Sequence, residues 1–495
     1  MESPTPPSRA FWLGAGLAAL VIMTLSFWVA SREWFSQDDF AFLSYVRITD
    51  PWSWLQVYLP FEERFWTFYR PLSMETFFWV GYRLFGLEAF GFFAVSLGLH
   101  FLSAGLVYRL ARQLGFDARV ALATALLAVS RHGSLGEIYY GSVFMYVGEV
   151  FFSLVSISFF LDYLRRGRAA AQLASCLGLV LALLCNEVAV AIPVLLVWVA
   201  LGAGQATLRG RGGLRLLRAL LPQGVLTLLY LVFRFHWIAP AATPEVYTPQ
   251  LGVQVLLNYV RILSFVFGDV KALLAALALA TALLIAVMAR WDARLHGGPL
   301  RAAAACAAWI ATTLAPFALL PFAQGRWAMP LAVPVCLLLG ALLEAFRRSY
   351  APRRAWALEV GLLALVFASL PYGALLARAT DPVGAYPRRI VEWIDAQEPP
   401  LSSRAVLVLL YEAPGLAKAA DAARLRYLSY GGGVINAAYP ETQRVMRFVD
   451  LSRRPPRNAI RPDSIYLGLG PDLGVAGADA RLLDRELPRR FEPAR

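Results

Sequence analysis

Long apolar runs separated by short polar segments dominate the sequence. The first run, Phe11 to Ala30, contains no charged residue, and about 20 residues of α-helix span the ~30 Å of hydrocarbon in a bilayer. Because 59% of the residues are hydrophobic and only 16% are charged, a soluble globular domain is excluded. Ten further apolar runs cover residues 88–110, 119–132, 141–164, 169–186, 188–206, 215–238, 271–290, 300–320, 327–346 and 354–374. The sequence therefore predicts an all-α polytopic membrane protein with about 11 transmembrane helices.

Arginines mark the side of the membrane on which each loop lies. They gather in the loops after every second run, at residues 109–119, 165–168, 209–218, 290–301 and 347–354. By the positive-inside rule these loops are cytoplasmic, which places the N-terminus inside and the C-terminus outside. The first run is longer than the 7–15 apolar residues of a cleaved signal peptide, so a retained anchor is expected. The arginines explain the net charge of +13, and no nucleic-acid partner is predicted.

The segment after the first run is expected to lie along the outer membrane surface. Residues 31–87 mix Trp and Phe with Glu and Arg, a composition suited to helices whose rings lie at headgroup depth. Residues 250–267 have a similar composition.

The composition changes near residue 380. Residues 404–413 and 463–470 have the pattern of short buried strands, and residues 387–397 and 414–425 that of helices. We therefore expect a transmembrane domain over residues 1–378 and a small extracytoplasmic α/β domain over residues 379–495.

Two adjacent carboxylates, Asp38 and Asp39, follow the first apolar run. Adjacent side chains on a helix point about 100° apart, so both can face one substrate atom only if the backbone departs from a helix. We expect one to be the working base and the other its support. The alternative is that the pair caps an interfacial helix, because Asp is a favoured N-cap residue.

Four other charged residues lie in segments that the same topology places outside. Arg70 lies in "FYRPLS", Glu137 in "RHGSLGEIYYGS", Glu187 in "LLCNEVAVAIPVLL" and Arg326 in "LPFAQGRWAMP". The predicted topology brings these segments and the acidic pair to one membrane face.

This ordered set of motifs resembles the GT-C superfamily of polytopic glycosyltransferases. The resemblance covers roughly residues 10 to 350 and is closest to the protein O-mannosyltransferase-like branch, which includes bacterial relatives of the transmembrane and tetratricopeptide-repeat mannosyltransferases. Asn186 stands where those relatives commonly have a lysine, so no role of that lysine is transferred. The resemblance implies an inverting glycosyltransferase of the bacterial inner membrane. Such an enzyme moves a sugar from a polyprenyl-phosphate carrier to a hydroxyl of a protein, lipid or glycan on the extracytoplasmic face.

The resemblance also implies roles for the charged residues. Asp38 matches the base that accepts the proton of the acceptor, with Asp39 as the second choice. Arg326 is the candidate for the carrier phosphate because a guanidinium is a planar fork of donors, and Arg70 is the second choice. The alternative for both arginines is interfacial anchoring.

Each of the two glutamates, Glu137 and Glu187, has two possible roles. Glu137 would orient the acceptor or a metal ion, or is a solvated interfacial residue. Glu187 is expected to pair structurally, with donor binding as the alternative.

Cofactor and function alternatives stay open at this point. The superfamily includes members that use a divalent metal ion and members that do not, whereas the isolated histidines His132 and His236 do not predict a metal site. The alternative functions are a transporter or flippase of lipid-linked glycans and a non-catalytic envelope scaffold. A transporter is expected to carry charges near the bilayer midplane and to contain two related halves, and neither is evident.

Overall fold

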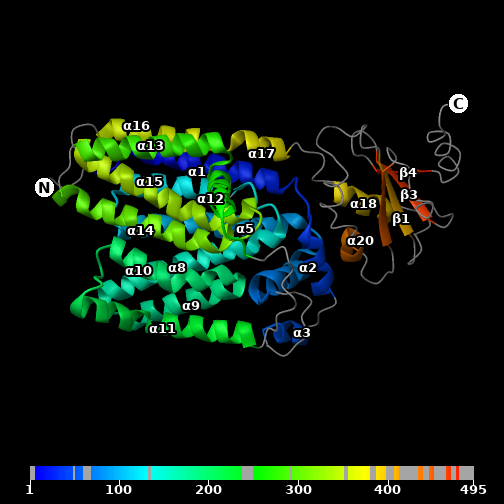
Figure 1. The fold of residues 1–495 in the computed structure, drawn as a ribbon. Helices are drawn as coiled ribbons and strands as arrows, with labels where there is room; N and C mark the ends of the chain where they lie inside the picture. The colour runs from blue at the N-terminus through cyan, green and yellow to red at the C-terminus, as the bar shows by residue number, and fades with distance from the viewer. Residues whose placement is uncertain are drawn as a thin grey trace.

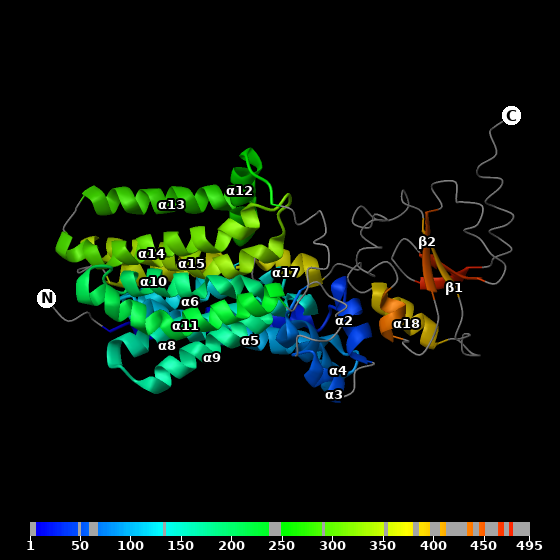
Figure 2. The same cartoon turned by 60° about the horizontal axis from the view of Figure 1, so that its bottom comes forward.

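The fold is that of a computed structural model, shown in Figures 1 and 2. The structure describes residues 6–47, 51–58, 68–131, 135–236, 249–289, 293–350, 355–379, 386–396, 406–411, 433–438, 445–450, 464–469 and 475–478.

Each of the eleven predicted apolar runs forms a helix, and these helices lie side by side in one bundle (Figures 1 and 2). They are α1 (Arg9–Ala30), α5 (Ala89–Gln113), α6 (Ala118–Ser130), α8 (Phe144–Arg166), α9 (Ala169–Cys185), α10 (Ile192–Gly202), α11 (Gly210–His236), α13 (Val270–Ala289), α14 (Ala293–Ala318), α15 (Met329–Tyr350) and α16 (Ala355–Ala368). In the described part of the chain, eight helical stretches are long and apolar enough to cross a membrane. The shorter apolar helices include α6, α9 and the segment from Glu187 to Gly202. The prediction of a polytopic α-helical membrane protein is confirmed.

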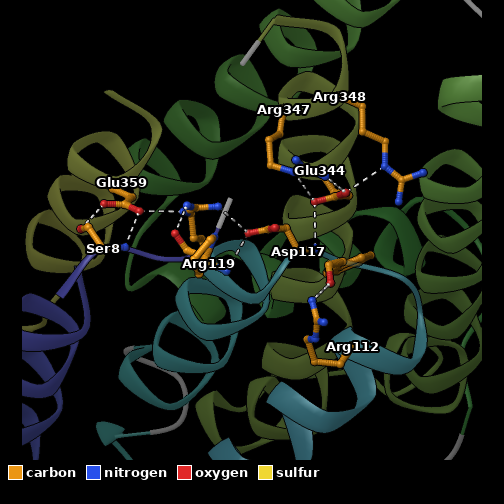
Figure 3. A network of polar contacts seen from close by, with 10 residues as sticks. Ser8, Arg112, Asp117, Arg119, Glu344, Arg347, Arg348 and Glu359 are labelled. Carbon is orange, nitrogen blue, oxygen red and sulfur yellow. Dashed lines mark hydrogen bonds and ion pairs between the residues drawn. The ribbon is translucent and has the colours of Figure 1, made fainter. Parts of the chain in front are cut away.

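A network of ion pairs fastens the helices together at the arginine-rich end of the bundle (Figure 3). The Arg119 guanidinium at the start of α6 donates to the Glu359 carboxylate of α16 at 2.7 Å and lies 3.5 Å from Asp117. Glu359 also accepts from the backbone N–H of Ser8, immediately before α1. These arginines, interpreted from sequence as topology signals, also join helices that are distant along the chain.

Glu344 is the second buried anion of this end. Its carboxylate, fully buried on α15, lies 2.8 Å from both Arg347 and Arg348. It also accepts the backbone N–H of Asp117 at 3.0 Å. The two arginines and the N–H together compensate for the loss of water around this charge.

The opposite end of the bundle carries short helices and turns. These are α2 (Asp38–Arg47), α3 (Pro51–Gln56), the π-helix η1 (Pro71–Thr76), α4 (Phe77–Phe85), the 3₁₀ helices η2 (Gly141–Val143), η3 (Glu187–Ala191) and η5 (Gly325–Ala328), and α12 (Val253–Phe267). Figure 1 shows α2 and α3 at the end of the bundle that lies away from the N-terminus. Buried aromatic rings hold α2 in place, including those of Phe35, Phe40 and Phe78.

The chain after α16 forms α17 (Tyr372–Ala379), α18 (Tyr386–Asp395), α20 (Gly433–Ala438) and a four-stranded sheet. The sheet order is β2 (Val445–Asp450), β1 (Val406–Tyr411), β3 (Ser464–Leu469), β4 (Val475–Ala478). β1 pairs parallel with β2 and β3, and β4 pairs antiparallel with β3. The two predicted strands and the helix predicted over residues 387–397 are confirmed as β1, β3 and α18. The helix predicted over residues 414–425 lies outside the described residues.

The helix α20 packs against α2. Its Val434 and Ile435 are fully buried in the same apolar cluster as Phe40 and Leu43 of α2. Part of the chain beyond the last apolar run therefore covers the helix that begins with the acidic pair.

The ion pair between Arg119 and Glu359 yields a prediction of stability. Their side chains are only 4% and 9% exposed, so Arg119→Met leaves a buried carboxylate without its cation. We expect the free energy of unfolding, measured in mixed micelles, to fall by about 3–5 kcal/mol. Arg166→Gln, at an exposed position at the end of α8, is the matched control and should change it by less than about 0.5 kcal/mol. Equal stability of the two variants would contradict this role of the pair.

Candidate active site

The chain makes a strained turn directly before the acidic pair. Gln37 has a φ of +56°, a left-handed conformation that no other described non-glycine residue adopts. This conformation is uncommon for residues with a side chain and persists only where the surroundings fix it. Two features fix the chain here. Trp34 and Phe35, just before Gln37, are buried, and the Trp34 ring N–H donates to the Leu87 carbonyl at 3.1 Å. The start of α2 is therefore held in one position.

The Asp39 carboxylate is fully buried and is satisfied by backbone donors. It accepts the N–H of Ser142 at 2.7 Å, of Gly141 at 3.0 Å and of Ser36 at 3.3 Å. These bonds fix the turn at η2 against the start of α2, across about a hundred residues of chain. Asp39 is thus the supporting member of the pair, and its oxygens face N–H groups rather than open space.

Burial raises the pKa of the Asp39 carboxyl to about 7, although the N–H groups of Ser142 and Gly141 lower it. The folded-state pKa lies above the unfolded value, so the folded protein binds more protons than the unfolded chain between about pH 4 and 7. The contribution of Asp39 to stability is therefore greatest at the acidic end of this range and falls as the pH rises through it.

Asp38 has the opposite environment. Its side chain is 41% exposed, and its Oδ2 lies 3.6 Å from Nη1 of Arg326. The Nε–H of Arg326 donates to the Gln324 side chain at 2.6 Å, which holds the guanidinium in the turn at η5. The structure thus places the first candidate for the base beside the first candidate for the phosphate ligand.

Glu137 lies against the same turn. A Cβ atom on Gly325 would be only 2.5 Å from Oε1 of Glu137, so the carboxylate approaches the backbone immediately before Arg326. Only glycine permits this approach without a shift of the glutamate. The segments that carry Asp38, Glu137 and Arg326 therefore meet at one place.

Arg70 and Glu187 form a second pair. The Arg70 Nε and Nη2 donate to the two Glu187 oxygens at 2.6 and 2.5 Å, a bidentate geometry. The guanidinium also covers the Phe68 ring, 4.4 Å from its centroid. The fork of Arg70 is thus directed at Glu187, which leaves Arg326 as the better placed candidate for a phosphate.

Tyr146 lies near both ion pairs and was not identified from the sequence. Its buried phenol on α8 interacts electrostatically with Arg70, Arg326 and Glu187. A tyrosine near the end of an apolar helix carries no sequence signal for such a role, because tyrosines are enriched at membrane–water interfaces in any case. All six residues singled out from the sequence therefore lie at this end of the bundle.

We compared the chain with known proteins. Neither the protein-family models nor the curated proteins yield a match. Among solved structures, ArnT from Cupriavidus metallidurans in the apo state has a TM-score of 0.52 at 17% identity, with 92% of each chain covered. ArnT bound to undecaprenyl phosphate scores 0.48 at 15% identity, covering 93% of each chain. The Archaeoglobus fulgidus oligosaccharyltransferase AglB, in complex with an inhibitory peptide and a dolichol-phosphate, scores 0.45 at 12% identity, covering 89% of this chain and 64% of that one.

The chain has the GT-C fold. The resemblance seen in the sequence motifs is thereby confirmed at the level of the fold. The mannosyltransferase branch is not singled out by these neighbours.

A metal ion, which the GT-C resemblance left open, does not fit the acidic pair. Both Asp39 oxygens accept backbone N–H groups, and Asp38 faces a guanidinium. The described residues contain no cluster of three or more His, Cys, Asp or Glu side chains suited to a metal, and His132 lies outside them. We therefore derive no step through a metal ion.

The different environments of the two aspartates predict different effects of the same substitution. Asp39→Asn would point an amide N–H₂ at a backbone N–H, which leaves a buried donor unsatisfied. We expect the free energy of unfolding to fall by about 1–3 kcal/mol. Asp38→Asn is the matched control and should leave it within about 0.5 kcal/mol, since Asp38 is partly exposed. Unfolding of both variants in mixed micelles measures the difference, and a larger loss for Asp38→Asn would reverse the assignment.

Proposed function

We propose that this protein is an inverting glycosyltransferase that moves a sugar from a polyprenyl-phosphate carrier to an acceptor hydroxyl. The observation that carries the proposal is the proximity of Asp38 and Arg326, 3.6 Å apart at the end of a bundle with the GT-C fold. One carboxylate and one guanidinium supply the two groups that such a transfer requires. The base takes a proton from the acceptor, and the cation stabilises the leaving phosphate.

The transfer proceeds in one displacement. The acceptor oxygen attacks the anomeric carbon while its proton passes to the Asp38 carboxylate. The bond between the anomeric carbon and the phosphate oxygen breaks, and the phosphate leaves with the electron pair beside Arg326. A phosphate is a weak base, so no general acid is required on that side.

The environments of the nearby acids support inversion. A retaining enzyme needs a second carboxylate that attacks the anomeric carbon. Asp39 is fully buried against backbone N–H groups, and Glu187 is bound by Arg70. Of these three acids, Asp38 has the most exposed side chain, at 41%, and a single displacement with Asp38 as the base inverts the configuration of the sugar. We assign to Glu137, beside Gly325, the orientation of the acceptor.

An apolar cavity of about 570 Å³ supports a lipid-borne donor. It lies between α13, α15 and α16, and its lining is mostly Leu and Ala side chains. A prenyl chain fits this apolar lining.

The helix α12 contacts both the cavity and the turn that carries Arg326. Leu263 and Phe267 of α12 line the cavity, and α12 packs against η5, which carries Arg326. The carriers named in the ArnT and AglB structures, undecaprenyl phosphate and dolichol-phosphate, are prenyl phosphates like the carrier proposed for this protein.

We further propose that the site faces the extracytoplasmic side of a bacterial inner membrane. The arginine-rich loops lie at the other end of the bundle from Asp38, which agrees with a cytoplasmic position for those loops. Residues 1–378 then form the transferase domain, and residues 379–495 form an outer domain.

The central prediction concerns Asp38 and Arg326. Asp38→Asn removes the base, and we expect kcat to fall by about 10²–10⁴-fold. Arg326→Gln removes the phosphate ligand and should lower kcat by about 10²–10³-fold. The measurement is release of polyprenyl phosphate by the purified protein in liposomes, supplied with undecaprenyl-phosphate hexoses and pentoses and a membrane extract as acceptor.

Glu88→Gln is the control for this prediction, because Glu88 is an exposed acid at the start of α5, at the same end of the bundle. It should leave turnover unchanged. Full turnover by Asp38→Asn would contradict the base assignment. Movement of intact lipid-linked sugar across the bilayer without cleavage would instead favour the flippase.

The cavity yields an independent prediction about the donor. Ala276 of α13 lines the cavity, whereas Ala278 of the same helix is exposed and does not. Ala276→Phe should raise KM for an undecaprenyl donor about tenfold, because lost burial of two methylene groups costs ~1.6 kcal/mol. A donor with a ten-carbon chain should be unaffected, as should both donors with Ala278→Phe. Equal effects of the two substitutions would place the prenyl chain elsewhere.

A further inference from the structure

Arg378 is a largely buried cation that no sequence motif singled out. It lies in α17, between the last long helix of the bundle and the outer sheet. Its Nε donates to the Glu33 carboxylate at 2.7 Å, and its Nη1 donates to the Gly136 carbonyl at 2.7 Å. Its guanidinium also covers two rings, with centroids at 5.1 Å for Tyr139 and 4.8 Å for Tyr140.

We propose that Arg378 is a positioning residue that holds the two outer turns of the candidate active site in register. The proposal rests on the proposed glycosyl transfer. Arg378 touches none of the reacting groups assigned above, and it acts through the backbone and side chains that carry them.

The first contact of Arg378, with Glu33, holds the segment that leads to Asp38. Glu33 lies in the short connection between α1 and α2, five residues before Asp38. Its side chain is only 9% exposed, so the ion pair with Arg378 fixes the path of this connection. The strained Gln37 follows within the same connection.

The second contact reaches the turn that carries Glu137. The Gly136 carbonyl belongs to the peptide unit that continues into Glu137, so its hydrogen bond with Arg378 fixes the direction in which that side chain leaves the backbone. Tyr139 and Tyr140, under the guanidinium, lead directly into Gly141 and Ser142. The N–H groups of these two residues bind Asp39.

An arginine suits this position better than a lysine. A planar guanidinium donates in two directions while its face covers aromatic rings, whereas an ammonium group is a compact charge without a stacking face. Each contact of Arg378 uses a different part of the fork or its face. The geometry therefore predicts that charge alone does not replace Arg378.

The test compares Arg378→Gln and Arg378→Lys with Arg388→Gln, a matched control at an exposed ion pair of α18. Hydrogen exchange of the backbone amides of residues 33–40 and 135–142 is measured on the full-length protein in detergent, without substrate. We expect both segments to exchange at least about tenfold faster in Arg378→Gln, with Arg378→Lys close to it and the control like the unaltered protein. Unchanged exchange in Arg378→Gln would overturn the proposal.

Kinetics form the second arm of the test. We expect Arg378→Gln to lower kcat by up to ~100-fold with a change in donor KM of less than about threefold, because a misplacement of 1 Å costs about that much. Guanidinium ion added to Arg378→Ala should restore part of kcat. An unchanged kcat, or a loss confined to KM, would contradict a positioning role.

The test still decides if Arg378→Gln does not fold or if the protein transfers no sugar. If Arg378→Gln does not fold, Glu33→Gln keeps the Gly136 contact and should still accelerate exchange of residues 33–40; unchanged exchange there overturns the proposal. If the unaltered protein transfers no sugar, the proposed function fails, whereas the exchange experiment still decides whether Arg378 holds the two turns.

Discussion

The bond between the Asp39 carboxylate and the backbone N–H groups of Gly141 and Ser142 is the contact on which the outer end of the protein depends. It joins the first outer segment to the second, and both carry residues of the candidate active site. A buried carboxylate is costly unless donors surround it, so the contact also selects one geometry of the turn. Once Asp39 is fixed in this way, its neighbour Asp38 points elsewhere, because adjacent residues at the start of a helix diverge by about 100°. The pair thus divides into an anchor and an exposed acid.

Carboxylates are paired with arginines at both ends of the bundle, but the pairs differ in how closely they are enclosed. At the arginine-rich end, Glu359 and Glu344 are buried and surrounded by donors from several segments, which suits a fixed junction. At the opposite end, Glu33 is bound in the same closed manner by Arg378, whereas Glu187 is 34% exposed and is held through both of its oxygens by Arg70. The contact of Asp38 with Arg326 is longer, at 3.6 Å, and more exposed. Of the three ion pairs described at this end, it has the longest contact, so a substrate separates its two partners most easily.

The sequence predicted the helices well because an apolar run of membrane length has few alternatives to a helix. It also predicted which turns meet, because arginine clusters fix the side of each loop. It could not divide the roles of Asp38 and Asp39, since that division depends on N–H groups about a hundred residues away. Tyr146 and Arg378 were missed for the same reason. Their contacts are made by residues distant along the chain, and neither lies in a pattern that differs from its surroundings. Arg70 and Arg326 look alike in sequence, and only the bidentate contact with Glu187 distinguishes them.

The contact between Asp38 and Arg326 has a consequence for the order of the proposed reaction. Without substrate, the Asp38 carboxylate and the Arg326 guanidinium occupy each other. A phosphate is a stronger and bidentate partner for the guanidinium than an acid at 3.6 Å. Binding of the donor phosphate to Arg326 would therefore loosen the contact between Arg326 and Asp38, which frees a carboxylate oxygen of Asp38 to accept a hydrogen bond from the acceptor hydroxyl. In the proposed reaction, the carboxylate that removes the proton from the acceptor thus becomes available when the leaving group is in place, which favours transfer over loss of the proton without a donor.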